Sequence, residues 1–212
     1  MLKNAAFLFD LDGVIIDTEP QYDIFWRKAA EDYQLGIEKF ENVIKGTTLP
    51  NIFSIHFSHF PEEVHRKIAI ANQTFELKMD IIPVPGALAF LEEVREAGIP
   101  MGLVTSSDDC KIEYVFNRLP IRQYFDTIVS ADRITHGKPD PMCYLLAAQD
   151  LGISPENCYV FEDSFNGIKS GNAAGMKVIG LSTTNSADSI TNDCIKVIPD
   201  FCDFSVYLLF SE

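Results

Sequence analysis

The chain has 212 residues, of which 47% are hydrophobic, enough for one domain with a sizeable core or for a domain that carries an insertion. Its net charge of −14 disfavours binding to nucleic acid or to an anionic membrane, and an anionic ligand would need a local source of positive charge such as a metal ion. Five cysteines, an odd number without metal-ligand spacing, indicate reduced thiols in a cytoplasmic protein rather than a disulfide framework or a zinc site.

The first predicted element is a strand at 5–9. It is short, apolar and without alternation, which is typical of a strand buried on both faces of a parallel sheet. The run is too short for a signal peptide or a membrane span. Asp10 and Asp12 follow at its carboxyl end, and Gly13 lets the backbone turn away. Because open α/β sheets bind ligands outside these strand ends, the sequence puts two carboxylates where a site is expected.

A helical insertion is predicted at 17–80. Apolar residues at 22–33 recur at three- and four-residue steps, which indicates an amphipathic helix, with Thr18 as its N-cap and Gly36 as its stop. A second helix is predicted at 61–79, with proline and acidic residues in its first turn. No strand is predicted in the rest of this segment.

Beyond the insertion, strands and helices alternate. The proline-rich connector at 82–86 is predicted to be the return strand of a hinge. The elements that follow are helices at 86–97, 108–118, 141–151 and 166–174, strands at 100–104, 127–130, 158–161, 177–181 and 195–198, and a short apolar helix at 204–210. Such alternation implies right-handed crossovers and a doubly wound parallel sheet. We therefore predict an α/β fold with a core domain at 1–16 and 81–212, interrupted by a small α-helical domain at 17–80.

Polar residues collect at the strand ends of this predicted sheet. Besides the first acid pair, they are Thr105-Ser106-Ser107, Gly137-Lys138-Pro139-Asp140-Pro141 and Glu162-Asp163-Ser164. Two acid pairs, a hydroxyl group beside backbone N–H groups and one lysine form a set suited to phosphoryl transfer. Each cluster alone is explained as well by a turn, a cap or a helix start. Four of them at one sheet edge favour a site.

These four segments, in this order, resemble the four motifs of the haloacid dehalogenase (HAD) superfamily, in its β-phosphoglucomutase-like branch with a helical cap after the first motif. The resemblance covers essentially the whole chain. It implies a Rossmann-like core and a Mg²⁺-dependent phosphatase that acts on a small phosphorylated metabolite, such as a sugar phosphate, through an aspartyl-phosphate. The cap is expected to close over the crevice, exclude water and select the leaving group.

The resemblance also implies catalytic roles. Asp10 is expected to be the nucleophile, and Asp12 the general acid and then the general base. Thr105, with the N–H of Ser106, is expected to hold the phosphate oxygens, and Lys138 to stabilise the nucleophile and the transferring group.

The expected metal ligands are acidic. A carboxylate about 3.5 Å from a dianionic phosphate meets roughly 9 kcal/mol of repulsion at an effective dielectric constant of ~20, so a cation is needed. The resemblance implies Mg²⁺ held by Asp10, the backbone carbonyl of Asp12 and Asp163, with Glu162 as a further or water-bridged ligand.

The main alternative is a β-phosphoglucomutase, which must also hold a second phosphate. The mutases of the family carry an arginine where this chain has Leu49, a lysine where it has Asp108 and a histidine where it has Tyr22. These differences favour hydrolysis. Lys45, a candidate substrate-binding residue, or Arg66 could compensate for the missing cations.

Two further alternatives fit less well. Halide-displacing relatives need no metal and lack the second aspartate of the first motif. A catalytically idle interaction module has no use for mutually repelling acids that cost stability. Tyr22 and Trp26 are interpreted as packing residues of the insertion. The chain is expected to be a monomer whose partner is a small phosphorylated molecule.

Overall fold

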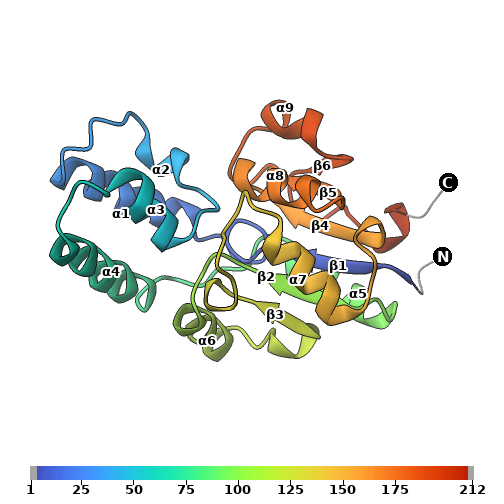
Figure 1. Cartoon of the computed structure of the whole chain (residues 1–212). Helices are drawn as coiled ribbons and strands as arrows, with labels where there is room; N and C mark the ends of the chain where they lie inside the picture. Colours follow the sequence, from blue (N-terminus) through green and yellow to red (C-terminus); the bar gives the residue numbers. More distant parts are fainter. Residues whose placement is uncertain (1–3, 210–212) are drawn as a thin grey trace.

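The structure, a computed structural model, describes residues 4–209 and contains one parallel sheet (Figure 1). The strand order within these residues is β3-β2-β1-β4-β5-β6, so the order reverses between β1 and β4, as predicted for a doubly wound sheet. The strands are β1 Ala6–Phe9, β2 Met101–Val104, β3 Thr127–Val129, β4 Cys158–Glu162, β5 Lys177–Leu181 and β6 Lys196–Ile198. Every strand predicted for the sheet is present, with its ends within two residues of the expected position.

Strand β1 lies between β2 and β4 and is buried on both faces. Phe7 and Phe9 point into one hydrophobic cluster, and Ala6 and Leu8 point into the cluster on the opposite face. Phe9 stacks on Phe161 of β4 with ring centroids 4.6 Å apart. Burial of both faces explains why the strand has no alternation of apolar and polar residues.

Helices cover both faces of the sheet. One face is covered by α5 (Ala87–Glu96) and α6 (Asp109–Arg118), the other by α7 (Met142–Leu151), α8 (Phe165–Ala173) and α9 (Ala187–Ile190). Short 3₁₀ turns lie at Arg122–Tyr124, Ala131–Arg133, Pro155–Asn157, Thr191–Asp193 and Val206–Leu209. The last replaces the α-helix predicted at 204–210, whose residue Phe210 lies outside the described residues. Within residues 4–209, none of the helices combines the length and apolar content that crossing a membrane requires.

Four helices form a group beside the sheet, drawn in blue to teal in Figure 1. They are α1 (Glu19–Asp32), α2 (Phe40–Val43), α3 (Leu49–His56) and α4 (Glu62–Glu76). They share a hydrophobic cluster of their own that includes Trp26, Phe40 and Phe57. This cluster explains α2 and α3, which are too short to be stable alone and were not predicted individually.

Helix α1 starts after the predicted N-cap residue, but the cap hydrogen bond and the end of the helix differ from the prediction. Thr18 occupies the N-cap position, but its hydroxyl makes no cap hydrogen bond and donates instead to Asp12. The helix ends at Asp32, before the predicted stop at Gly36, because Gln34 already has the left-handed backbone conformation, with φ of 51°.

The two segments that join the helices to the sheet run antiparallel. The N–H of Asp17 donates to the carbonyl of Ile82 at 2.8 Å, and the N–H of Val84 donates to the carbonyl of Ile15 at 3.0 Å. Ile16 and Pro83 form the bridge between them. The return strand predicted at 82–86 is therefore reduced to one bridge with flanking hydrogen bonds, and no regular strand forms there. All five cysteines are free thiols, also as predicted.

Gly86, at the start of α5, has φ of +77°, and a Cβ atom there would lie 2.5 Å from the carbonyl carbon of Phe201. We expect Gly86→Ala to lower the free energy of unfolding by at least about 2 kcal/mol, part of it from left-handed strain and part from displaced backbone. Gly98 has φ of +68° with no atom in reach of a Cβ, so Gly98→Ala should cost only the strain, about 1 kcal/mol. Urea denaturation of both variants measures the difference, and equal losses would contradict the contact.

Candidate active site

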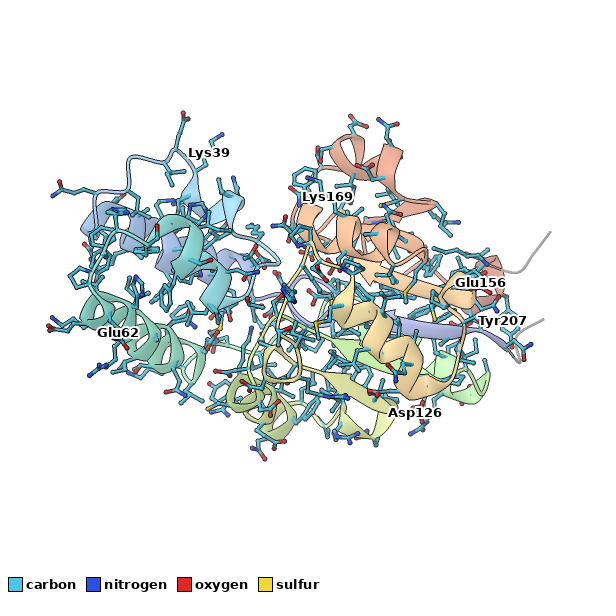
Figure 2. All side chains as sticks on the ribbon, viewed as in Figure 1. Lys39, Glu62, Asp126, Glu156, Lys169 and Tyr207 are labelled. Carbon is cyan, nitrogen blue, oxygen red and sulfur yellow. The ribbon has the colours of Figure 1, made fainter. Side chains whose placement is uncertain are left out.

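Most charged side chains shown here are exposed at the surface, but one lysine is buried and ion-paired at the edge of the sheet. Lys39, Glu62 and Lys169 point outward from the molecule (Figure 2). In contrast, Lys138 is 1% exposed and makes ion pairs at the carboxyl ends of the strands. Burying charged groups is costly even when they are paired. A buried lysine with two carboxylates at the sheet edge therefore indicates a functional site.

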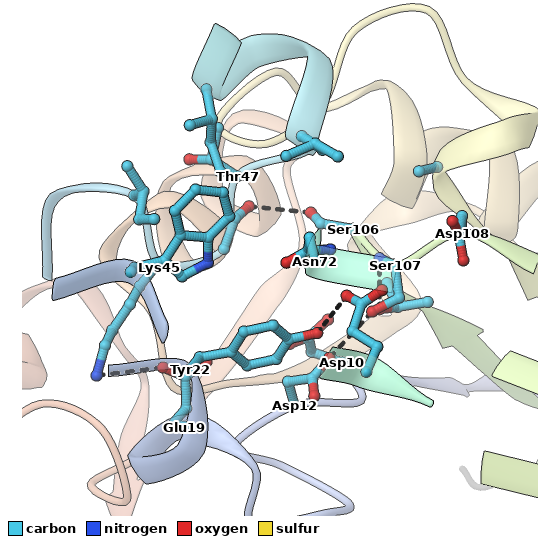
Figure 3. A pocket seen from close by; sticks show the side chains of 18 of the residues that line it. Asp10, Asp12, Glu19, Tyr22, Lys45, Thr47, Asn72, Ser106, Ser107 and Asp108 are labelled. Carbon is cyan, nitrogen blue, oxygen red and sulfur yellow. Dashed lines mark hydrogen bonds and ion pairs between the residues drawn. The ribbon is translucent and has the colours of Figure 1, made fainter. Parts of the chain in front are cut away.

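A cavity of about 320 Å³ lies between the sheet and the helices α1–α4 (Figure 3). The core supplies Asp10, Asp12, Asp163 and the segment 105–108 to its lining. The helical segment supplies further residues, namely Glu19, Tyr22, Trp26, Glu41, Ile44, Lys45, Gly46, Thr47, Leu49, Pro50, Ile52, Asn72 and Glu76. Tyr22 and Trp26 therefore line the cavity in addition to packing within the insertion.

Lys138 lies directly behind the cavity and joins two of the clusters. Its Nζ donates to Oδ1 of Asp10 at 2.8 Å, to Oε1 of Glu162 at 2.6 Å and to the carbonyl of Val104 at 3.2 Å. Burial alone would lower the pKa of Lys138, but the carboxylates of Asp10 and Glu162 raise it by more, so the net shift is upward. The lysine is therefore a fixed cation.

Asp10, immediately after β1, is nearly fully buried. Burial raises the pKa of Asp10 to about 7, since the stabilising charge of Lys138 is opposed by the negative charges of Glu162 and Asp12. One ammonium group does not offset this concentration of carboxylates. A second cation near Asp10 would stabilise its ionised form.

Glu162, at the end of β4, is fully buried and accepts hydrogen bonds at both oxygens. Oε1 accepts from Lys138 and from the hydroxyl of Tyr144 at 2.8 Å. Oε2 accepts from the hydroxyl of Ser164 at 3.1 Å and from the backbone N–H groups of residues 163 and 164. These contacts hold Lys138 and the turn after β4 in place.

The acids at this edge fit a divalent metal ion. Asp10, Glu162 and Asp163 each offer a carboxylate oxygen, and these oxygens lie within 4.8 Å of one another. Burial and then the nearby carboxylates raise the pKa of Asp163 well above its ordinary value. Gly13, with φ of +77°, makes room for the carboxylate of Asp163, since a Cβ at residue 13 would lie 2.0 Å from Oδ2. Oxygen-only ligands of this kind suit Mg²⁺.

Asp12 has a partner that sequence reasoning missed. Both its oxygens lie 2.5 Å from Nζ of Lys111, a residue of α6 that is 1% exposed. Oδ2 also accepts from the hydroxyl of Ser107 at 3.1 Å, and Oδ1 from Thr18. The sequence held one signal that Lys111 needs a partner. The residue lies directly before Ile112 on the buried face of its helix, where an unpaired lysine is costly.

The remaining predicted residues lie at the same cavity. The hydroxyl of Thr105 accepts from the N–H of Ser107 at 3.1 Å, and the hydroxyl of Ser106 donates to the carbonyl of Gly46 at 3.0 Å. Lys45 also lines the cavity, but its Nζ is paired with Glu19 at 3.1 Å and with Asp23 at 3.0 Å. Arg66, the other compensating cation considered from the sequence, is exposed and is not part of the lining.

Comparison with known proteins agrees with this arrangement. Residues 5–175 match the haloacid dehalogenase-like hydrolase family. The chain is similar to hexitol phosphatase A of Escherichia coli K12, with 36% identity over 191 residues, covering 85% of this chain and 84% of the relative. It is also similar to a phosphorylated carbohydrates phosphatase of Thermotoga maritima, with 33% identity over 186 residues, covering 82% of this chain and 83% of the relative.

A solved structure supports the same grouping. The β-phosphoglucomutase of Clostridium difficile superposes with a TM-score of 0.82 and 28% identity, over 97% of this chain and 95% of that one. The parallel sheet, the buried acids at its carboxyl edge and a family match over most of the chain agree with one another. The protein belongs to the haloacid dehalogenase-like hydrolase family.

Proposed function

We propose that the protein is a Mg²⁺-dependent phosphatase that hydrolyses a small phosphorylated metabolite, namely a sugar or polyol phosphate, through an aspartyl-phosphate. The observation that carries the proposal is the convergence of Asp10, Lys138 and Asp163 beside one cavity. The similarity to a hexitol phosphatase and to a phosphorylated carbohydrates phosphatase supports this substrate class.

The proposed reaction has two halves. In the first, a carboxylate oxygen of Asp10 bonds to phosphorus, the bond from phosphorus to the leaving oxygen breaks, and Asp12 gives that oxygen a proton. In the second, Asp12 takes a proton from water, which attacks phosphorus, releases phosphate and frees Asp10. Thr105 and the N–H of Ser106 would hold the non-bridging oxygens, with Lys138 beside them.

The proposed metal site consists of Asp10, Asp163 and the backbone carbonyl of Asp12. Bound there, Mg²⁺ would supply two positive charges against those of the phosphate and of the acids. Glu162 was expected from the sequence to be a further ligand, directly or through water. Since both its oxygens already accept protein hydrogen bonds, we propose that Glu162 mainly positions Lys138.

Lys111 extends the proposed role of Asp12. A buried ammonium group 2.5 Å from both carboxylate oxygens holds the side chain of Asp12 in one orientation. The hydroxyl groups of Thr18 and Ser107 fix it further. We propose Lys111 as a positioning residue for the general acid.

A panel of phosphate monoesters tests the proposal. With Mg²⁺ present, we expect phosphate release from at least one sugar or polyol monophosphate. With β-glucose 1-phosphate and a trace of glucose 1,6-bisphosphate, we expect free phosphate and no net glucose 6-phosphate, because Leu49 and Asp108 line the cavity where a mutase needs cations. Net glucose 6-phosphate would establish a mutase instead, and no reaction with any monoester would remove the phosphatase proposal.

A further inference from the structure

The part of the cavity formed by α1 and α4 contains a connected set of polar side chains. Tyr22 of α1 donates its hydroxyl hydrogen to Oε1 of Glu76 at 2.6 Å and accepts from Nζ of Lys111 at 2.6 Å. Asn72 and Glu76 lie one turn apart on α4, and both line the cavity. The hydroxyl of Tyr22 thus already donates one hydrogen bond and accepts another, whereas Asn72 and Glu76 can each accept a further hydrogen bond.

The side-chain oxygen of Asn72 is a buried acceptor that receives no hydrogen bond within the described residues. Asn72 is buried, with only 7% of the residue exposed. Its Oδ1 atom has no hydrogen-bond partner within the described part of the chain. Buried acceptors are rarely left unpaired in folded proteins, and one that lines a cavity is a candidate for pairing with a bound ligand (Figure 3).

The charges around this part of the cavity restrict what that ligand is. Apart from the acids of the proposed reaction centre, the described lining carries five carboxylates, those of Glu19, Glu41, Glu76, Asp108 and Asp132. Lys45 is the one lysine or arginine among the described lining residues, and it is paired with Glu19 and Asp23. The ammonium group of Lys111 lies next to this lining, but both oxygens of Asp12 already pair with it. A second phosphate or a carboxylate would meet repulsion here, whereas hydroxyl groups can donate to these oxygens.

We propose that Asn72 and Glu76 form a hydroxyl-binding subsite that selects an uncharged, polyhydroxylated leaving group and excludes a second phosphate. The subsite rests on the proposed phosphatase function and specifies its substrate as a monophosphate. Oδ1 of Asn72 accepts from one hydroxyl of the leaving group, and a carboxylate oxygen of Glu76 accepts from another. Unpaired acceptors of this kind discriminate strongly against analogues that lack the hydroxyl.

The test compares two monoesters of equal chain length, sorbitol 6-phosphate and n-hexyl phosphate, which has no hydroxyl groups. The readout is the ratio of their kcat/KM values. We expect Asn72→Leu to lower the ratio, sorbitol 6-phosphate over n-hexyl phosphate, about tenfold. Gln73→Leu is the matched control, because Gln73 is exposed on the same helix and does not line the cavity, and it should leave the ratio within twofold of wild type.

A second variant tests the exclusion of charge. Glu76→Gln retains the shape of the side chain and an oxygen that can accept from Tyr22, but removes the negative charge. We expect its kcat/KM for fructose 1,6-bisphosphate, relative to that for fructose 6-phosphate, to rise about fivefold over wild type.

The outcomes separate the subsite from the function on which it rests. A wild-type protein that hydrolyses both sorbitol 6-phosphate and n-hexyl phosphate, with an unchanged ratio in Asn72→Leu, overturns the subsite and leaves the phosphatase standing. An unchanged preference between bisphosphate and monophosphate in Glu76→Gln overturns the exclusion of charge. A wild-type protein that hydrolyses no monoester of the wider panel overturns the proposed function and the subsite with it, whereas activity on other sugar phosphates but not on sorbitol 6-phosphate overturns the subsite alone.

Discussion

Asp10→Asn should lower kcat for phosphate monoester hydrolysis by at least about 10⁴-fold, because an amide supplies no carboxylate oxygen to accept phosphorus. Phosphate release in a single-turnover assay with Mg²⁺ measures the loss. The matched control is Asp17→Asn, which makes the same change at an exposed carboxylate seven residues further on and should keep wild-type activity.

The stability of this variant separates lost chemistry from lost folding. The substitution removes a buried negative charge that repels Glu162, while Lys138 keeps its contacts with Glu162 and with the carbonyl of Val104. We therefore expect the Tm of Asp10→Asn to match or exceed that of wild type. Activity above about 1% of wild type in the folded variant would remove Asp10 as the nucleophile.

Removing divalent cations should lower kcat by at least about 10³-fold, and added Mg²⁺ should restore it. The buried acids repel one another, so a cation between them should also stabilise the fold. We expect Mg²⁺ to raise the Tm of the chelator-treated protein in a concentration-dependent manner. Differential scanning calorimetry measures this stabilisation independently of activity.

Asp163→Asn identifies the site of this stabilisation. Asp163 is buried within the acid cluster, so the variant should lose most of the Mg²⁺-dependent rise in Tm, whereas Asp17→Asn should retain it. Full activity in excess chelator would contradict a Mg²⁺ mechanism. An undiminished rise in Tm for Asp163→Asn would place the cation elsewhere.

The sheet could be predicted from the sequence because its strands follow a simple rule. Strand β1 is apolar without alternation, and both of its faces are buried. The polar residues that follow each strand then had to meet at one edge, which is why Asp10, Lys138 and Asp163 were identified together. The rule depends on local pattern and on chain order, both of which a single sequence carries.

Contacts that helix packing creates between residues distant in the sequence could not be predicted in this way. Lys111 lies 99 residues from Asp12, and nothing local to either residue indicates the pairing. Thr18 has the residue type and position of a cap, but the carboxylate of Asp12 competes for its hydroxyl hydrogen. The unpaired acceptor of Asn72 likewise arises only from how α4 packs across the cavity.

The antiparallel bridge between Ile16 and Pro83 has an evolutionary consequence. Hydrogen bonds between the two chain segments at this bridge bring the exit and re-entry points of the helical segment together. A segment of another length or sequence can therefore be inserted between them without shifting the register of β1 against β4. Under the proposed function, substrate preference would then diverge by replacement of that segment, while the acids and the lysine at the sheet edge stay in place.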